Sequence, residues 1–277
     1  MTIKKKNLYK VVRYVILTLL SIFTVIPFLI LPIVSMKTKQ EYLLNPMALP
    51  SKINFNNYIE VFKRANILGA FSNSLIIMLG ALALEIVLGS LTAYALTKMQ
   101  FKRAGTFSAI FLAPMIFPIQ AITVPLYLIY KNIGLTNTYI GMILLEAALG
   151  LPMTIFMMTS FMKTIPIQIS ESATIDGAGH GTILFHLIVP LLKPVISTIA
   201  VVCGISVWNA FYVPMIMLTK QSMRTLPLTI YDFMGMYEND WTLLSACIIF
   251  VILPIIIMYI FLQKNIINGV TAGAVKG

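Results

Sequence analysis

Few side chains in this sequence could do acid–base, nucleophilic or metal chemistry. The two histidines, His180 and His186, lie six residues apart, on opposite sides of a helix, so they are not expected to share a metal ion. The two cysteines, Cys203 and Cys247, are too few for a four-cysteine metal site, and both fall in apolar segments that favour a packing role. The sequence has no phosphate-binding loop, zinc-protease motif or serine-hydrolase motif. It therefore predicts a protein that is not an enzyme.

Two acids, Glu85 and Glu146, lie within long apolar segments. Carboxyl groups are costly inside a membrane and by default indicate a functional site. We expect Glu146 to line a cavity, together with the candidate residues Tyr127, Trp208 and Asn209. Trp208 could stack on a sugar or simply pack between helices. Proton-coupled transport through Glu85 and Glu146 is the alternative hypothesis.

A polar, glycine-broken stretch between two apolar segments, residues 162–194, is the third candidate site. Ile165, Ile169 and Ala173 recur every four residues, which predicts a short helix with one face to bury. Three glycines then break this helix, and a second short helix is expected at 182–189. We interpret the stretch as a rigid helix–turn–helix that docks a protein partner.

The composition of the chain predicts the secondary-structure elements that hold these candidate residues. The chain has 277 residues, of which 59% are hydrophobic and 10% charged, whereas a soluble domain has about 25% charged residues. Several apolar stretches approach the ~20 residues that a spanning helix needs, and they do not alternate as barrel strands would. The sequence thus predicts an all-α membrane protein with six transmembrane helices, at about 12–35, 71–97, 106–130, 139–161, 195–219 and 243–263.

Small residues and prolines predict how these helices pack and bend. Gly80 and Gly89 in the second span would let neighbouring helices approach closely. Pro114 and Pro118 are expected to kink the third span. In the outer loop 36–70, we expect a short helix around Tyr58.

Charge predicts the orientation of the chain. Six spans place the segments 1–11, 98–105, 162–194 and 264–277 on one side of the membrane. With Arg13 counted, this side carries twelve Lys and Arg residues and two acidic residues, whereas the other side carries eight Lys and Arg residues and five acidic residues. The positive-inside bias therefore places both termini in the cytoplasm. A basic arm at 1–11 would precede a transmembrane domain at 12–263, and a cytoplasmic tail would follow at 264–277, too rich in glycine for a stable helix. The net charge of +11 is thus attributed to orienting loops and not to nucleic-acid binding.

The polar stretch resembles the EAA loop of the permease subunits of ABC importers, in which E-A-A is followed by D-G-A, a Phe and I-x-L-P. Ser172 and Val189 depart conservatively from that pattern. The matching residues are Glu171, Ala173, Asp176, Gly177, Ala178, Phe185, Ile188 and Pro190.

Further segments are similar to the carbohydrate-uptake branch of this family, specifically to the second subunit of maltose-type permeases. They are the tail 269–277, the segment from Trp208 to Pro214, Thr225 to Pro227, Asn56 to Tyr58, and Ala93 to Ala95. This similarity covers nearly the whole chain. A permease for a non-sugar solute would keep the EAA loop and lack this tail.

The resemblance implies a set of partners and contacts. A second permease subunit would pair with this one as a heterodimer in a prokaryotic cell membrane, and an extracytoplasmic solute-binding protein would deliver a sugar. Two ATPase subunits would bind ATP and Mg²⁺, with no cofactor held by this chain. The EAA loop would act as a cytoplasmic coupling helix through Glu171, Ala173, Asp176, Gly177 and Ala178. The tail would contact the ATPases through Thr271, Gly273 and Lys276.

Overall fold

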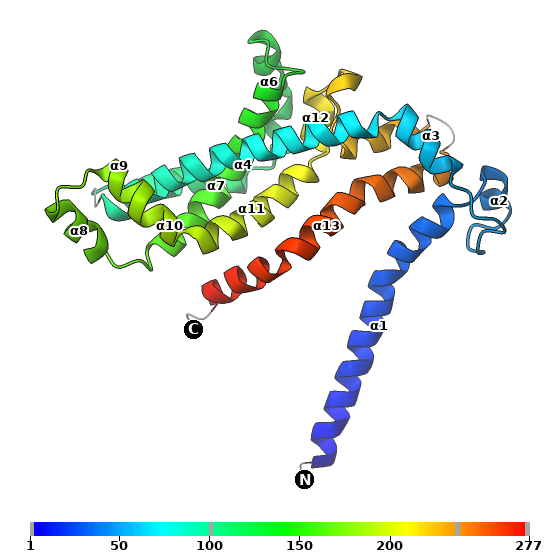
Figure 1. Ribbon diagram of the computed structural model, residues 1–277, viewed down its shortest axis with the longest axis horizontal. Coiled ribbons are helices and arrows are strands. Elements are labelled where there is room, and N and C mark those ends of the chain that lie inside the picture. The colour runs from blue at the N-terminus through cyan, green and yellow to red at the C-terminus, as the bar shows by residue number, and fades with distance from the viewer. Residues whose placement is uncertain (1–2, 100–101, 236–238, 275–277) are drawn as a thin grey trace. The chain divides into compact units, whose positions relative to one another are not determined.

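A computed structural model describes residues 3–99, 102–235 and 239–274, with side chains described between 10 and 260 (Figure 1). Every regular element in these ranges is helical. The chain divides into two units, residues 1–67 with 229–253, and residues 68–228 with 254–277. Each unit is described by itself below.

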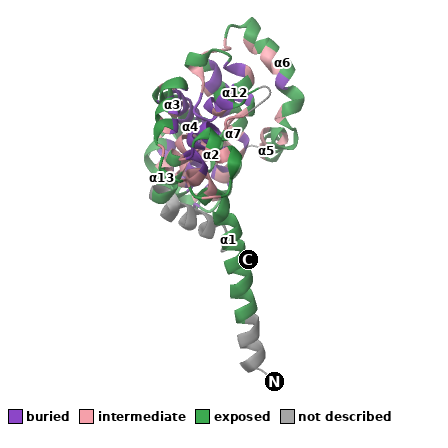
Figure 2. Ribbon diagram, turned by 90° about the vertical axis from the view of Figure 1, so that its right-hand side faces the viewer, coloured by how far each residue is buried: buried purple, intermediate pink, exposed green. Residues whose placement is uncertain are grey.

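Four helices are long and apolar enough to cross a membrane, or up to six spans if each of two bent helix pairs counts as one. The four are α1 (Ile3–Ser35), α4 (Ile67–Lys98), α7 (Tyr139–Met162) and α13 (Trp241–Ala274). They overlap the first, second, fourth and sixth predicted spans. The described residues of α1 are exposed over most of their length, as expected of a helix surrounded by lipid or by another chain (Figure 2).

The third predicted span, 106–130, is not one helix. It is divided into α5 (Ala104–Leu112), a 3₁₀ turn η1 (Ala113–Ile116) and α6 (Ile119–Asn132), with a bend of 97°. Pro114 and Pro118 flank the break, and each lacks the amide that would continue the helical hydrogen bonds. The prolines thus predicted a kink, and the prediction of a single helix was wrong.

The fifth predicted span, 195–219, is helical only in its first part. Helix α11 (Lys193–Trp208) ends at Asn209, and a short helix α12 (Tyr212–Met217) follows. Pro214 has no amide to bond the carbonyl of Ala210, so a continuous helix through this point would lose a bond and clash. With 16 residues, α11 is shorter than a typical spanning helix.

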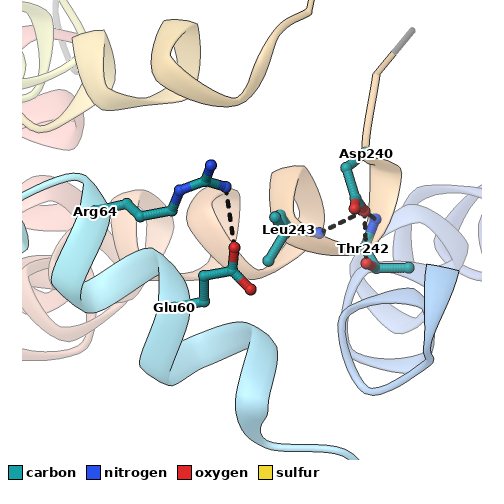
Figure 3. A network of polar contacts seen from close by, with 5 residues as sticks. All are labelled: Glu60, Arg64, Asp240, Thr242 and Leu243. Atoms are coloured by element: carbon teal, nitrogen blue, oxygen red, sulfur yellow. Dashed lines mark hydrogen bonds and ion pairs between the residues drawn. The ribbon is translucent and has the colours of Figure 1, made fainter.

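The tail differs from its prediction as well, because α13 continues without interruption to Ala274. Glycine lowers helix stability by only about 1 kcal/mol per residue, so Gly269 and Gly273 do not end this long helix. At its other end, Asp240 caps α13, since its Oδ1 accepts from the amides of Thr242 and Leu243 at 3.1 and 3.3 Å (Figure 3).

The first unit fixes the outer loop on the end of α1. It contains α2 (Lys39–Leu44) and the predicted short helix, α3 (Asn56–Arg64). The Lys37 side chain is fully buried and its Nζ donates to the carbonyls of Asn45 and Pro46 at 2.8 and 3.1 Å. Asn57 Nδ2 donates to the carbonyls of Ser35 and Lys37. The chain after α1 is therefore an ordered loop and not a loose linker.

Close helix contacts form the core of the second unit, where α7 packs on α11. A Cβ added to Gly80 would lie 2.6 Å from Ile143 Cδ1, and one added to Gly89 would lie 2.5 Å from Thr154 Cγ2. A larger residue at either position would push α4 away from α7. The prediction that these glycines allow close packing is confirmed.

Candidate functional site

The polar insert between α7 and α11 begins with α8 (Gln168–Ile175), which ends in a Schellman motif. Gly177 has φ +84°, a left-handed conformation that L side chains rarely adopt. Its amide donates to the Thr174 carbonyl at 3.0 Å, and the Ala178 amide donates to the Ala173 carbonyl at 2.9 Å. The D-G-A sequence therefore terminates α8 and sets a fixed turn.

One side of α8 packs inward and the other is exposed. Ala173 and Ser170 are buried, next to the buried Ile165 that precedes the helix. Ile169 remains 37% exposed and Ile175 86% exposed. Glu171 and Asp176 are also exposed, so α8 presents two carboxylates beside uncovered apolar surface.

The second short helix of the insert lies close to its expected position, 182–189, but most of it is a π-helix and not an α-helix. Residues His180–Thr182 form α9, Ile183–Ile188 form a π-helix, η2, and Val189–Leu191 form α10. Ile183, Leu184 and Ile188 are buried, whereas Phe185 is 51% exposed. π-Helical turns are rare and are frequently found at functional sites.

Two side chains from the end of α4 hold this insert. The Lys98 ammonium donates to the Ile165 carbonyl at 2.6 Å, and Tyr94 Oη lies 3.1 Å from His180 Nδ1. The Tyr94 and His180 rings also meet edge to face at 6.0 Å. Sequence reasoning missed these contacts, although Tyr94 and Lys98 are four apart and thus share a helix face. Figure 1 shows α8, α9 and α10 gathered around this end of α4.

Glu85 and Glu146 both line a cavity of about 150 Å³ among α4, α7 and α11. Glu85 is fully buried near the middle of α4, and Glu146 is 6% exposed in the first third of α7. The other lining residues are Leu149, Gly150, Met153, Val202, Cys203, Ser206 and Val207. The structure thus brings together the two acids that the sequence could only place on separate spans.

Thr154 and Gly150 position the Glu85 carboxyl group. Thr154 Oγ1 donates to Glu85 Oε2 at 3.0 Å. A Cβ on Gly150 would collide with the Glu85 carboxyl group, so only glycine leaves room for it there. Cys203 Sγ lies 3.6 Å from Thr154 Oγ1 and extends the polar contacts to α11.

The remaining candidate lining residues do not join this cavity. Trp208 is 1% exposed and packs edge to face on Phe71, with ring centroids 5.6 Å apart. Asn209 is exposed at the end of α11, and Tyr127 is partly exposed on α6. These positions favour the packing interpretation of Trp208.

The predicted tail contacts lie at the end of α13. Thr271 and Gly273 belong to its helical backbone. Lys276 lies outside the described residues.

Comparisons with known proteins identify this arrangement of helices. Residues 85–271 match the family described as "Binding-protein-dependent transport system inner membrane component". The chain is 31% identical to the diacetylchitobiose uptake system permease protein NgcG of Streptomyces coelicolor, over 97% of this chain and 89% of that protein. It is 34% identical to the melibiose/raffinose/stachyose import permease protein MelC of Bacillus subtilis, over 91% of each.

A solved structure has the same fold. It is the crystal structure of a bacterial ABC transporter involved in the import of the acidic polysaccharide alginate, one chain of which superposes with a TM-score of 0.82. The match covers 95% of this chain and 98% of that chain at 22% identity. The family match over residues 85–271, with the relatives at 31% and 34% identity, shows that the chain belongs to the inner-membrane permease components of binding-protein-dependent ABC transporters.

Proposed function

We propose that this chain is the permease subunit of an ABC importer that takes up a sugar or oligosaccharide across a prokaryotic cell membrane. Family membership supports the transport role, and the named substrates of NgcG and MelC support a carbohydrate cargo. In this proposal the bent pair α5–α6 counts as one span and α11 with α12 as another, which gives six spans with both termini in the cytoplasm.

The geometry of the insert carries the coupling part of the proposal. Helix α8 has an inner face packed on its own unit, a fixed turn at Gly177 and an outer face with Glu171, Ile175 and Asp176 exposed. Such a face suits docking on an ATPase subunit, and a rigid element transmits displacement better than a loose loop. ATP and Mg²⁺ would bind the ATPases, and this chain would form half of the translocation path beside a second permease.

Charge reversal on the insert tests the docking. Glu171→Lys should abolish most sugar-dependent ATP turnover of the assembled importer while the chain still inserts in the membrane. Glu60→Lys is the matched control, because Glu60 is an exposed helical glutamate outside the insert and pairs with Arg64 at 3.0 Å (Figure 3). Equal turnover in the two variants would show that α8 does not dock the ATPase.

Topology and cargo have separate tests. Single cysteines introduced at Ser172 and at Lys52 should react with a membrane-impermeant thiol reagent from opposite sides of the membrane, the one at Ser172 from the cytoplasm. The native Cys203 and Cys247 are buried and give the background labelling.

Uptake of labelled sugars in a deletion strain identifies the cargo. Loss of uptake of a peptide or polyamine alone would contradict the carbohydrate assignment.

A further inference from the structure

The cavity among α4, α7 and α11, called the carboxyl cavity below, is lined by the two buried acids Glu85 and Glu146. The proposed transport role does not explain why these acids are there. Glu85 Oε1 and Glu146 Oε1 are buried and have no hydrogen-bond partner among the residues that the structure describes. Both side chains line the same cavity, from α4 and α7. Because an unpartnered polar atom is costly to bury, we expect a further group at these two oxygens.

The missing group must bring positive charge. The residues lining the cavity include no Lys, Arg or His, and Cys203 is the one titratable neighbour of the two acids there. Lys98, on the same helix as Glu85, lies thirteen residues away, or about 20 Å along the helix. Two uncompensated carboxylates in the interior would cost several kcal/mol each.

The size of the cavity decides between possible occupants. A volume of about 150 Å³ is below the roughly 300 Å³ at which ligand pockets begin. It accommodates a few water molecules, at about 30 Å³ each in the liquid. Calcium and magnesium prefer six or more oxygen ligands, and the described residues contain no group of three or more His, Cys, Asp or Glu that could hold a metal ion. A proton accompanied by water fits the space and the unpaired oxygens, and it removes one of the two negative charges.

We propose that Glu85 and Glu146 bind one proton between them, through water in this cavity. Thr154 fixes the oxygen at which it binds, because its hydroxyl donates to Glu85 Oε2 and leaves Oε1 without a partner among the described residues. The proton then lies between Glu85 Oε1 and Glu146 Oε1, as in carboxyl pairs of other proteins that share one proton. This inference does not depend on the cargo or on the docking of α8.

The test is infrared spectroscopy of the full chain in a lipid bilayer, with the glutamate side-chain carboxyls isotopically labelled. At neutral pH the wild type should show the carbonyl stretch of one protonated, isotope-shifted carboxylic acid. Glu85→Gln and Glu146→Gln should each lose that signal, because the amide of glutamine donates in place of the proton and the remaining carboxyl can ionise. Glu60→Gln, which removes an exposed carboxylate, should keep it.

Three outcomes would overturn the proposal. The first is a wild type that shows carboxylate stretches alone at neutral pH. The second is loss of the signal in one glutamine variant but not the other, which would assign the proton to a single residue. The third is a signal that appears in choline buffer and vanishes with sodium or potassium, which would make the cavity a metal-cation site. The comparison of choline with sodium or potassium buffer uses the wild type. It therefore distinguishes a bound proton from a bound metal cation even if a glutamine variant fails to fold.

Discussion

The insert and the carboxyl cavity use polar residues in opposite ways. In the insert, Glu171 and Asp176 are exposed on a short helix whose turn is set by local hydrogen bonds. In the cavity, Glu85 and Glu146 are buried and brought together by three helices that are distant in sequence. In the first arrangement the carboxylates lie on the surface, and in the second they line a small cavity. Substitutions that affect one region should therefore leave the other intact.

The largest expected effect comes from Gly150→Ala. The added methyl group would occupy the place of the Glu85 carboxyl group, and overpacking of this kind costs about 1–3 kcal/mol. We expect a lower thermal midpoint and loss of most transport, measured by unfolding in detergent and by uptake. Gly105→Ala is the control, because a Cβ there meets open space. Similar results for the two variants would mean that Glu85 does not need this clearance.

The contacts between α4 and the insert should give the next largest effect. Tyr94→Phe removes the hydroxyl near His180, and Lys98→Met removes the ammonium that bonds the Ile165 carbonyl. A charged hydrogen bond contributes about 1.5–3 kcal/mol, so Lys98→Met should uncouple ATP turnover from sugar uptake more than Tyr94→Phe does. The measurement is the ratio of ATP hydrolysed to sugar transported. Lys102→Met, which changes a neighbouring exposed lysine, should leave that ratio unchanged.

A smaller effect is expected at the turn of the insert. Gly177→Ala places a side chain at φ +84°, which costs about 1 kcal/mol, whereas Gly179 has an ordinary φ of −74° and open space around it. Protease cleavage within the insert should therefore rise in Gly177→Ala and not in Gly179→Ala. Equal cleavage of the two would show that the turn does not limit the rigidity of the insert.

These two regions also differ in how far the sequence predicts them. Local rules suffice for the insert, since Gly177 and the short helix before it follow from glycine conformation and helix spacing. Local rules also place Glu85 and Glu146 within apolar segments. They do not reveal that Gly150 leaves space for a carboxyl group or that Thr154 donates to it, because these contacts depend on how α4 packs against α7. The same limit explains the third span, where proline positions predicted a bend but not its extent.

The smallest predicted effect lies in the outer loop, away from both regions. The amide of Ser51 donates to the Glu41 carboxylate and, as the main cause, holds the pKa of Glu41 below its ordinary value of 4.5. A carboxyl group with a lowered folded-state pKa stabilises the fold above its unfolded-state pKa, and this contribution is lost as the pH falls through the folded-state pKa. Amide exchange at Ser51 should therefore be slow at neutral pH and accelerate relative to neighbouring amides below about pH 4.5. In Glu41→Gln that acceleration should be absent, because the glutamine side chain does not titrate; an unchanged profile in this variant would show that another group controls the order of the loop.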